Sequence, residues 1–137
     1  MSRDLILVVE DNEANQMLAR AVLELEGFEV RVAGDAIEAR EHLRAATPSL
    51  ILMDIQLPGE DGLSLTRELK DDPSTAAIPI VALTAHAMTG DKGTAIRAGC
   101  AGYIAKPIDT RTLGAQVRHF INRHAGEDRE LGAMRSA

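Results

Sequence analysis

The sequence is poor in cysteine and in aromatic residues. It has one cysteine, no tryptophan, one tyrosine and two phenylalanines among 137 residues. The lone Cys100 excludes an intrachain disulfide framework and favours the cytoplasm. The scarcity of aromatic rings argues against a stacking platform for single-stranded nucleic acid or for a flavin.

Long hydrophobic runs and excess positive charge are also missing. No apolar run approaches the roughly 18 residues that cross a bilayer, and the run at 5–9 is too short for a signal-peptide core. Acidic residues outnumber basic ones by 21 to 15, giving a net charge of −6, which repels nucleic acid. The basic residues within 118–124 are typical of a solvated helix face. We therefore expect no membrane and no nucleic acid among the partners, and a cytoplasmic location.

What the sequence does contain is a regular alternation of strand-like and helix-like segments. Strands are predicted at 5–9, 28–33, 50–53, 78–85 and 102–105, and helices at 13–26, 35–46, 62–72, 90–99 and 109–124. This order predicts an α/β fold, a (βα)5 doubly wound five-stranded parallel sheet. One domain is expected over residues 1–124. Residues 125–137 lack apolar periodicity and are predicted to form a flexible C-terminal tail.

The residues just beyond the predicted strands are the first candidates for a functional site, because ligands of open parallel sheets bind beyond the carboxyl ends of the strands. In chain order, these residues are Glu10 and Asp11, then Asp54, then Thr84 and Ala85, and finally Lys106 and Pro107. Three acids, a hydroxyl and a lysine are therefore expected to meet at one edge of the sheet.

The segment "LILMDIQLPGEDG" at 50–62 ends its apolar run on a single acid, Asp54. Three carboxylates held about 4 Å apart would repel by on the order of 4 kcal/mol per pair at an effective dielectric near 20. A bound cation would relieve this repulsion, and a set of oxygen ligands with so few carboxylates favours Mg²⁺. The alternatives are a water-facing strand end for Asp54 and helix capping for Glu10 and Asp11.

The chemistry that suits these residues is phosphorylation of a carboxylate. The first strand–helix loop, "EDNEAN", has no glycine and would repel a nucleotide phosphate unless a metal intervened. Asp54 is placed to attack phosphorus, while Mg²⁺ and Lys106 neutralise the phosphoryl oxygens and Thr84 donates a hydrogen bond. A carboxylate is already an anion, so no general base is required.

Four motifs in this order resemble the receiver domains of bacterial two-component response regulators. They are "VVEDN", "LILMDIQLPGEDG", "IPIVALTA" and "YIAKPI", and the resemblance covers about residues 4–123. It is strongest to stand-alone, single-domain receivers of the DivK type and to receivers of hybrid kinases. The resemblance implies the flavodoxin-like, CheY-like fold.

The resemblance also implies roles for particular residues. Glu10, Asp11, Asp54 and the backbone carbonyl of Gln56 would hold Mg²⁺. A sensor histidine kinase or a histidine phosphotransfer protein would phosphorylate Asp54, Lys106 would pair with the acyl phosphate, and Pro107 would follow a cis peptide bond. Thr84, followed by Ala85, would move toward the phosphoryl group as Tyr103 turns inward. Gln56 and His86 are candidates for tuning its hydrolysis, and residues 88–123 would bind a downstream partner.

Several functions remain open within this framework. Phosphorylation could switch protein–protein binding, or the chain could be a phosphorelay intermediate that passes its phosphoryl group to a histidine phosphotransfer domain. An aspartyl phosphatase is disfavoured, because Gln56 stands where such enzymes place a second Asp as general acid. We therefore expect no enzyme activity beyond the protein's own phosphorylation and dephosphorylation. Tyr103 could instead be a static packing residue, and Gln56 and His86 could merely line the rim.

Overall fold

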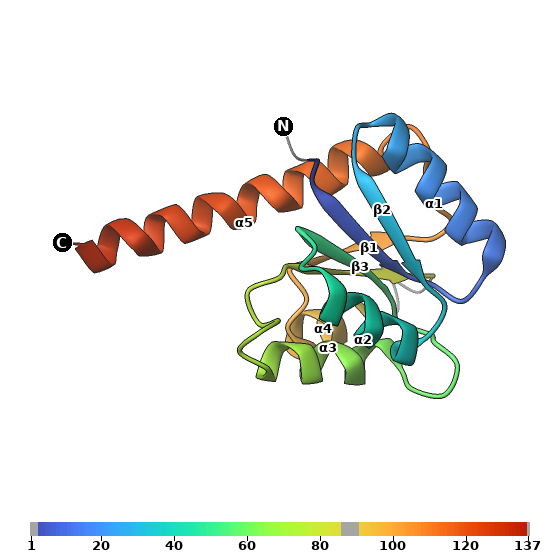
Figure 1. The fold of residues 1–137 in the computed structure, drawn as a ribbon, viewed down its shortest axis with the longest axis horizontal. Helices are drawn as coiled ribbons and strands as arrows, with labels where there is room; N and C mark the ends of the chain where they lie inside the picture. The colour runs from blue at the N-terminus through green and yellow to red at the C-terminus, as the bar shows by residue number, and fades with distance from the viewer. Residues whose placement is uncertain (1–2, 86–90, 137) are drawn as a thin grey trace.

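Five strands alternate with five helices along the part of the chain that the computed structural model describes, residues 3–85 and 91–136 (Figure 1). The strands are β1 (Leu5–Val9), β2 (Glu29–Ala33), β3 (Leu50–Asp54), β4 (Ile80–Thr84) and β5 (Gly102–Ala105). The helices are α1 (Glu13–Leu25), α2 (Ala36–Ala45), α3 (Gly62–Asp71), α4 (Asp91–Ala98) and α5 (Leu113–Ser136). The predicted order of elements is confirmed.

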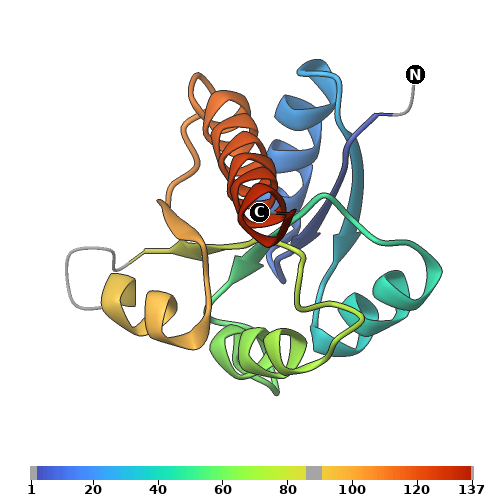
Figure 2. The same ribbon diagram turned by 90° about the vertical axis from the view of Figure 1, so that its left-hand side faces the viewer.

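All strand pairs are parallel, and the strand order is β2-β1-β3-β4-β5. Every residue of β3 and β4 is buried, as expected for apolar strands covered on both faces. Helices α1 and α5 cover one face, and α2, α3 and α4 cover the other (Figure 2). Alternate side chains of each strand enter two separate apolar clusters, one on each face. The predicted doubly wound sheet is confirmed.

Polar side chains fix where the first three helices begin. Asn12, Asp35 and Asp61 are N-caps that accept backbone N–H groups of the first turn. The last helix was predicted to begin at Asp109, but α5 begins at Leu113. The Asp109 carboxylate instead accepts the N–H of Arg111, and its carbonyl accepts that of Leu113. Asp109 therefore shapes the turn that leads into α5.

Apolar side chains of α1 differ widely in their exposure. Met17 is 69% exposed and Leu25 89% exposed, whereas Ala19 and Leu23 are fully buried. Helical periodicity thus located the helix correctly but did not identify the side chains that pack on the sheet. The difference arises because α1 has apolar residues on more than one face.

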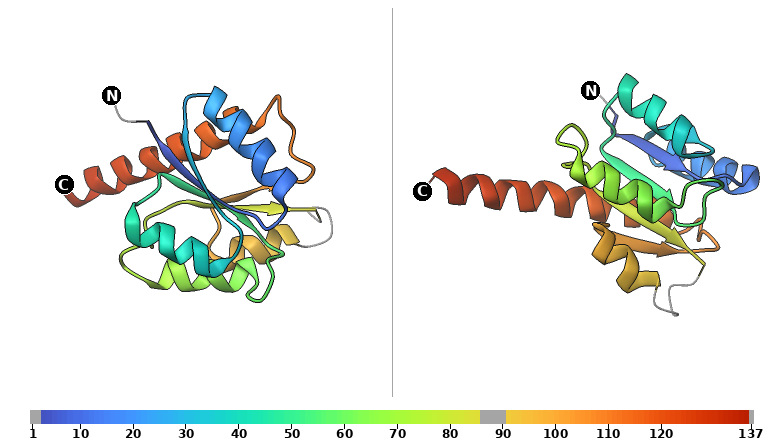
Figure 3. Two further views of the ribbon diagram at one scale, coloured as in Figure 1. Left: turned by 45° about the vertical axis from the view of Figure 1, so that its right-hand side comes forward. Right: turned by 90° about the horizontal axis from the view of Figure 1, so that it is seen from below.

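Helix α5 continues through residues for which a flexible tail was predicted. Its backbone is helical to Ser136, and its C-terminal half projects from the body of the domain (Figure 3). Residues 125–136 include no proline, and eight of the twelve are Ala, Glu, Arg, Leu or Met, which favour helix. The packed first half of α5 removes the need for a separate nucleation step. The lack of periodicity therefore did not indicate an irregular backbone, and flexibility of this segment stays a prediction.

Candidate phosphoryl-acceptor and metal site

Strand register brings the candidate residues to one edge of the sheet. Val9 pairs with Met53, so that Glu10 and Asp54 follow as neighbours across β1 and β3. Thr84 pairs with Ala105, which places Lys106 just beyond the end of β4. The strand order reverses between β1 and β3, where α/β proteins of this kind bind their ligands.

Glu10 is the most enclosed acid of the group, with only 1% of its surface exposed. Its Oε1 lies 2.8 Å from the Lys106 ammonium and accepts a hydrogen bond from the Asn15 side-chain amide at 3.1 Å. Its Oε2 accepts the backbone N–H of Asn12 at 3.2 Å. The first turn of α1 and the end of β5 therefore hold this carboxylate in one orientation.

Asp54 is also buried, with 3% of its surface exposed. The Gln56 backbone N–H donates to its Oδ1 at 3.0 Å, and the Lys106 Nζ lies 3.1 Å from its Oδ2. Lys106 thus contacts Glu10 and Asp54 at once. One ammonium cannot neutralise three carboxylates, so the site keeps an excess of negative charge.

The protonation of Glu10, Asp54 and Lys106 follows from this geometry. Burial, reinforced by the neighbouring Glu10 carboxyl, raises the pKa of Asp54 to about 6. Burial also acts to raise the pKa of Glu10, but hydrogen bonds with Asp54, Lys106 and Asn12 outweigh it and lower that pKa. Burial acts to lower the pKa of Lys106, but its two carboxylate partners outweigh it and raise that pKa. Glu10 and Lys106 therefore form the stable ion pair, and the charge on Asp54 is the costly one.

The three acids fit a small divalent cation. Glu10, Asp11 and Asp54 each offer an oxygen, and these oxygens all lie within 4.8 Å of one another. Around one octahedral Mg²⁺, with Mg–O distances near 2.1 Å, adjacent ligand oxygens lie about 3 Å apart and opposite ones about 4 Å apart. A slight contraction of the cluster would therefore bring the oxygens to these distances. Asp11 is exposed, which leaves one side of the site open to water ligands.

A small cavity lies beside Asp54 on the β4 and β5 side. Its volume is about 30 Å³, close to that of one water molecule in the liquid. Its lining consists of Asp54, Ile55, Gln56, Leu83, Thr84, Ala85 and Lys106. The structure thus brings Thr84 and Ala85 to the same place as Asp54 and Lys106. The Lys106–Pro107 peptide bond is cis, in agreement with the expectation.

Three predicted residues remain, and they differ in where they lie. Tyr103 is half-buried on β5 and lines a different groove, with residues of α5. His86 lies outside the described residues, as do 88–90 at the start of the expected partner surface. Gln56 is exposed and contributes its backbone N–H to Asp54.

Two residues that shape the site were not anticipated from the sequence. Asn15 binds Glu10 from the first turn of α1, and its only signal in the sequence is its place five residues after that acid. Gly62 begins α3 against the end of β3, where an added Cβ would lie 2.0 Å from the backbone oxygen of Asp54. A glycine at the end of "PGEDG" is a turn signal, but the close approach itself requires the folded structure.

Comparison with known proteins agrees with this geometry. Residues 6–118 match the family model described as the response regulator receiver domain. The polar-differentiation response regulator DivK of Brucella anthropi is 46% identical over 116 residues, which cover 85% of this chain and 94% of that protein. The chain therefore belongs to the response regulator receiver family, and within it to the DivK type.

Solved structures share this fold, and one of them is described with a bound metal ion. The receiver domain of a Pseudomonas aeruginosa sensor histidine kinase, with a magnesium ion coordinated in its active-site cleft, is 36% identical with a TM-score of 0.80. The alignment covers 88% of this chain and 99% of that one. A CheY-like receiver domain protein from Methanospirillum hungatei has a TM-score of 0.83 at 27% identity, over 92% of this chain and 99% of that one. The flavodoxin-like, CheY-like fold is thereby confirmed.

No helix within the described residues is both long and apolar enough to cross a lipid bilayer.

Proposed function

We propose that this protein accepts a phosphoryl group on Asp54, from a phosphohistidine of a sensor histidine kinase or a histidine phosphotransfer protein, in a Mg²⁺-dependent reaction. The observation that carries the proposal is the position of Asp54. Its buried carboxylate contacts the Lys106 ammonium at 3.1 Å and lies beside two further acids and a small cavity. Phosphorylation would then switch binding to another protein.

Each residue of the site would have a separate role in phosphoryl transfer. An Asp54 oxygen forms a bond to phosphorus as the phosphorus–nitrogen bond to the donor imidazole breaks, and the imidazole nitrogen keeps that electron pair and takes a proton from water. Lys106 is placed to neutralise a phosphoryl oxygen, and Thr84 lines the cavity into which the group would extend. Glu10, Asp11, Asp54 and the Gln56 carbonyl would hold Mg²⁺, whose charge lowers the barrier by neutralising the other phosphoryl oxygens.

Acetyl phosphate provides a direct test because it needs no kinase. The protein should gain the mass of one phosphoryl group in Mg²⁺ and gain nothing in excess EDTA. Asp54→Asn should remain unlabelled, whereas the exposed and remote Asp71→Asn should be labelled like the unchanged protein. Undiminished labelling of Asp54→Asn, or equal labelling in EDTA, would refute the assignment.

A second function, the phosphorelay intermediate, has the same acceptor chemistry and differs in the fate of the phosphoryl group. Protein phosphorylated with acetyl phosphate and freed of the donor would be mixed with a purified histidine phosphotransfer domain. Rapid transfer to that domain supports the relay. Slow transfer, together with a partner that binds only the phosphorylated form, supports the adaptor.

The proposed output surface lies within residues 88–123. In its described part, a groove of about 310 Å³ is lined by Tyr103, Thr112, Ala115, Gln116, His119 and Phe120. Tyr103 lies on β5, three residues before Lys106, so a change around the phosphoryl group has a short path to this groove. We propose that the protein acts in the cytoplasm and turns over no substrate other than its own phosphoryl group.

A further inference from the structure

The loop between β3 and α3, residues 55–61, contains the backbone groups that lie next to Asp54. It supplies the Gln56 N–H that holds Asp54 and the Gln56 carbonyl proposed as a metal ligand. It belongs to no helix or strand, and Gln56, Pro58 and Gly59 are exposed. Gly59 has a φ of +80°, so the loop turns sharply. The start of the loop is held by the sheet, since the Ile55 N–H donates to the Leu83 carbonyl at 3.2 Å, and its later residues depend on other contacts.

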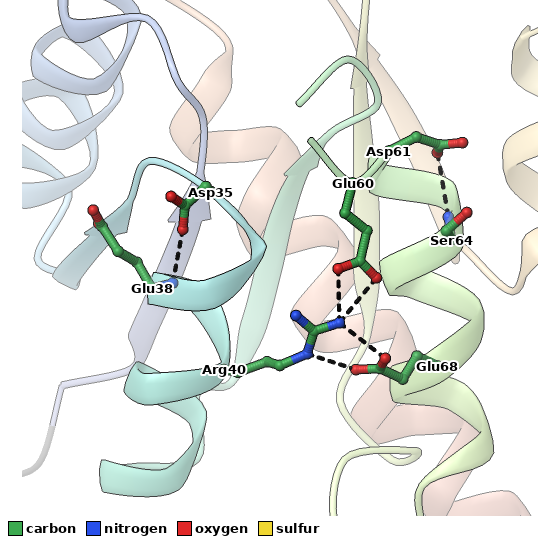
Figure 4. A network of polar contacts seen from close by, with 7 residues as sticks. All are labelled: Asp35, Glu38, Arg40, Glu60, Asp61, Ser64 and Glu68. Carbon is green, nitrogen blue, oxygen red and sulfur yellow. Dashed lines mark hydrogen bonds and ion pairs between the residues drawn. The ribbon is translucent and has the colours of Figure 1, made fainter. Parts of the chain in front are cut away.

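Arg40 of α2 holds the loop from the side (Figure 4). Its Nη2 donates to both carboxylate oxygens of Glu60, at 2.9 and 2.8 Å. Its Nε and Nη2 also donate to the two oxygens of Glu68 on α3, at 2.8 and 2.9 Å. One planar guanidinium thus joins α2 to both the loop and α3, and its Nη2 donates to both glutamates.

The elements on either side of the loop are themselves firmly placed. Helix α2 buries Ala36 and Ala39 against the sheet, and its first turn is capped by Asp35. Helix α3 is capped by Asp61, which accepts the N–H groups of Leu63 and Ser64. The loop therefore ends in a fixed helix, and Arg40 reaches it from a second one.

The contact with Glu60 is more enclosed than an ordinary surface ion pair. The side chains of Arg40 and Glu60 are 28% and 34% exposed, whereas that of Glu68 is 51% exposed. The hydrogen bonds that Arg40 donates to Glu68 and Glu60 raise its pKa, so its charge is permanent. The hydrogen bonds to Glu60 join two charged groups, which makes them stronger than neutral hydrogen bonds.

We propose that Arg40 is a positioning residue: by holding Glu60 it fixes the β3–α3 loop and, through Gln56, the geometry of Asp54 and its metal site. The part that concerns the metal rests on the proposed function. The part that concerns the loop does not.

The metal-free protein tests the loop directly. Backbone amide hydrogen exchange of residues 55–61 should be about fivefold faster in Arg40→Gln and in Glu60→Gln. Glu68→Gln is the matched control, because it removes a carboxylate from the same arginine and leaves the loop contact in place. Its loop exchange should match that of the unchanged protein. Unchanged exchange in Arg40→Gln and Glu60→Gln would overturn the proposal.

Mg²⁺ affinity, measured by calorimetry, gives the second readout. Arg40→Gln and Glu60→Gln should each bind Mg²⁺ about tenfold more weakly, and the double variant no more weakly than Glu60→Gln alone. Long-range charge predicts the opposite sign for Arg40→Gln, since removing a cation favours a dication. Equal or tighter binding by Arg40→Gln would therefore overturn the positioning role.

The two proposals fail in different ways. Failure of the unchanged protein to bind Mg²⁺ would refute the proposed function, and the exchange rates would still decide whether Arg40 holds the loop. Additive losses in the double variant would show that Arg40 and Glu60 act separately, which contradicts the inference.

Discussion

Asp54 should destabilise the metal-free protein at neutral pH, and replacing it with asparagine should stabilise it. The carboxylate is 3% exposed and lies against Glu10, so its pKa rises from an ordinary 3.8 to about 6. The difference, at about 1.4 kcal/mol for each pH unit, corresponds to about 3 kcal/mol of folding free energy. Asparagine has nearly the same shape and no charge, and it leaves Lys106 paired with Glu10.

The sign of this effect depends on pH. Below 3.8 the carboxyl is protonated in the folded and the unfolded chain, so its ionisation costs nothing. Between 3.8 and about 6 the unfolded chain loses the proton first, and the free energy of unfolding falls as pH rises. Above about pH 6 the carboxylate is ionised in both states, and its full destabilising effect persists. The gain from Asp54→Asn should thus approach about 3 kcal/mol at pH 8 and shrink to about 1 kcal/mol at pH 4.5.

Urea unfolding in EDTA at these two pH values measures the effect. The unchanged protein, Asp54→Asn and the exposed control Asp71→Asn would be compared, and the control should differ by less than about 0.5 kcal/mol. Mg²⁺ should stabilise the unchanged protein and have little effect on Asp54→Asn. An Asp54→Asn variant no more stable than the unchanged protein at pH 8, or equally stabilised at both pH values, would refute the electrostatic account.

Three further substitutions probe other parts of the structure. Gly62→Ala should lower the free energy of unfolding by about 1–3 kcal/mol and weaken Mg²⁺ binding, because its Cβ would lie 2.0 Å from a backbone oxygen at the end of β3. Gly34→Ala, whose Cβ would have no atom nearer than 3.7 Å, is the control, and equal thermal stability of the two variants would contradict the close approach. Leu23→Ala on the buried face of α1 should lower the free energy of unfolding by about 2–5 kcal/mol, whereas Leu25→Ser should change it by less than about 0.5 kcal/mol. Urea unfolding measures both, and a large loss for Leu25→Ser would show that Leu25 is covered. Lys106→Met should destabilise the metal-free protein by about 3 kcal/mol, since it leaves two buried carboxylates without their ammonium, and Mg²⁺ should restore most of the loss. If Lys106→Met and the unchanged protein had equal urea midpoints in EDTA, the ion pair would not stabilise the protein.

The sequence predicted the fold well because local signals agreed with one another. Apolar runs located the five strands, and the acids and the lysine just beyond them converge as the parallel topology requires. Asp54 and Lys106 were predictable because strand ends are defined by the same residues that form the core. The resemblance to receivers added the cis bond before Pro107, which periodicity alone does not indicate.

Other features depended on contacts between residues distant in sequence. Arg40 and Glu60 are 20 positions apart, and neither stands out in the local pattern. The exposed side chains of α1 could not be distinguished from buried ones, because two apolar faces satisfy the same helical period. The extension of α5 was missed because a helix without an apolar face resembles a solvated tail in sequence.

A crystal structure of the protein with Mg²⁺ and beryllofluoride, a mimic of the phosphoryl group, would test the assignment of Asp54 most directly. We expect beryllium bonded to an Asp54 oxygen, fluorine atoms contacting Lys106 and Thr84, and Mg²⁺ held by the proposed set of ligands, which are Glu10, Asp11, Asp54 and the Gln56 carbonyl. Beryllofluoride on any other carboxylate, or Mg²⁺ bound away from this edge of the sheet, would contradict it.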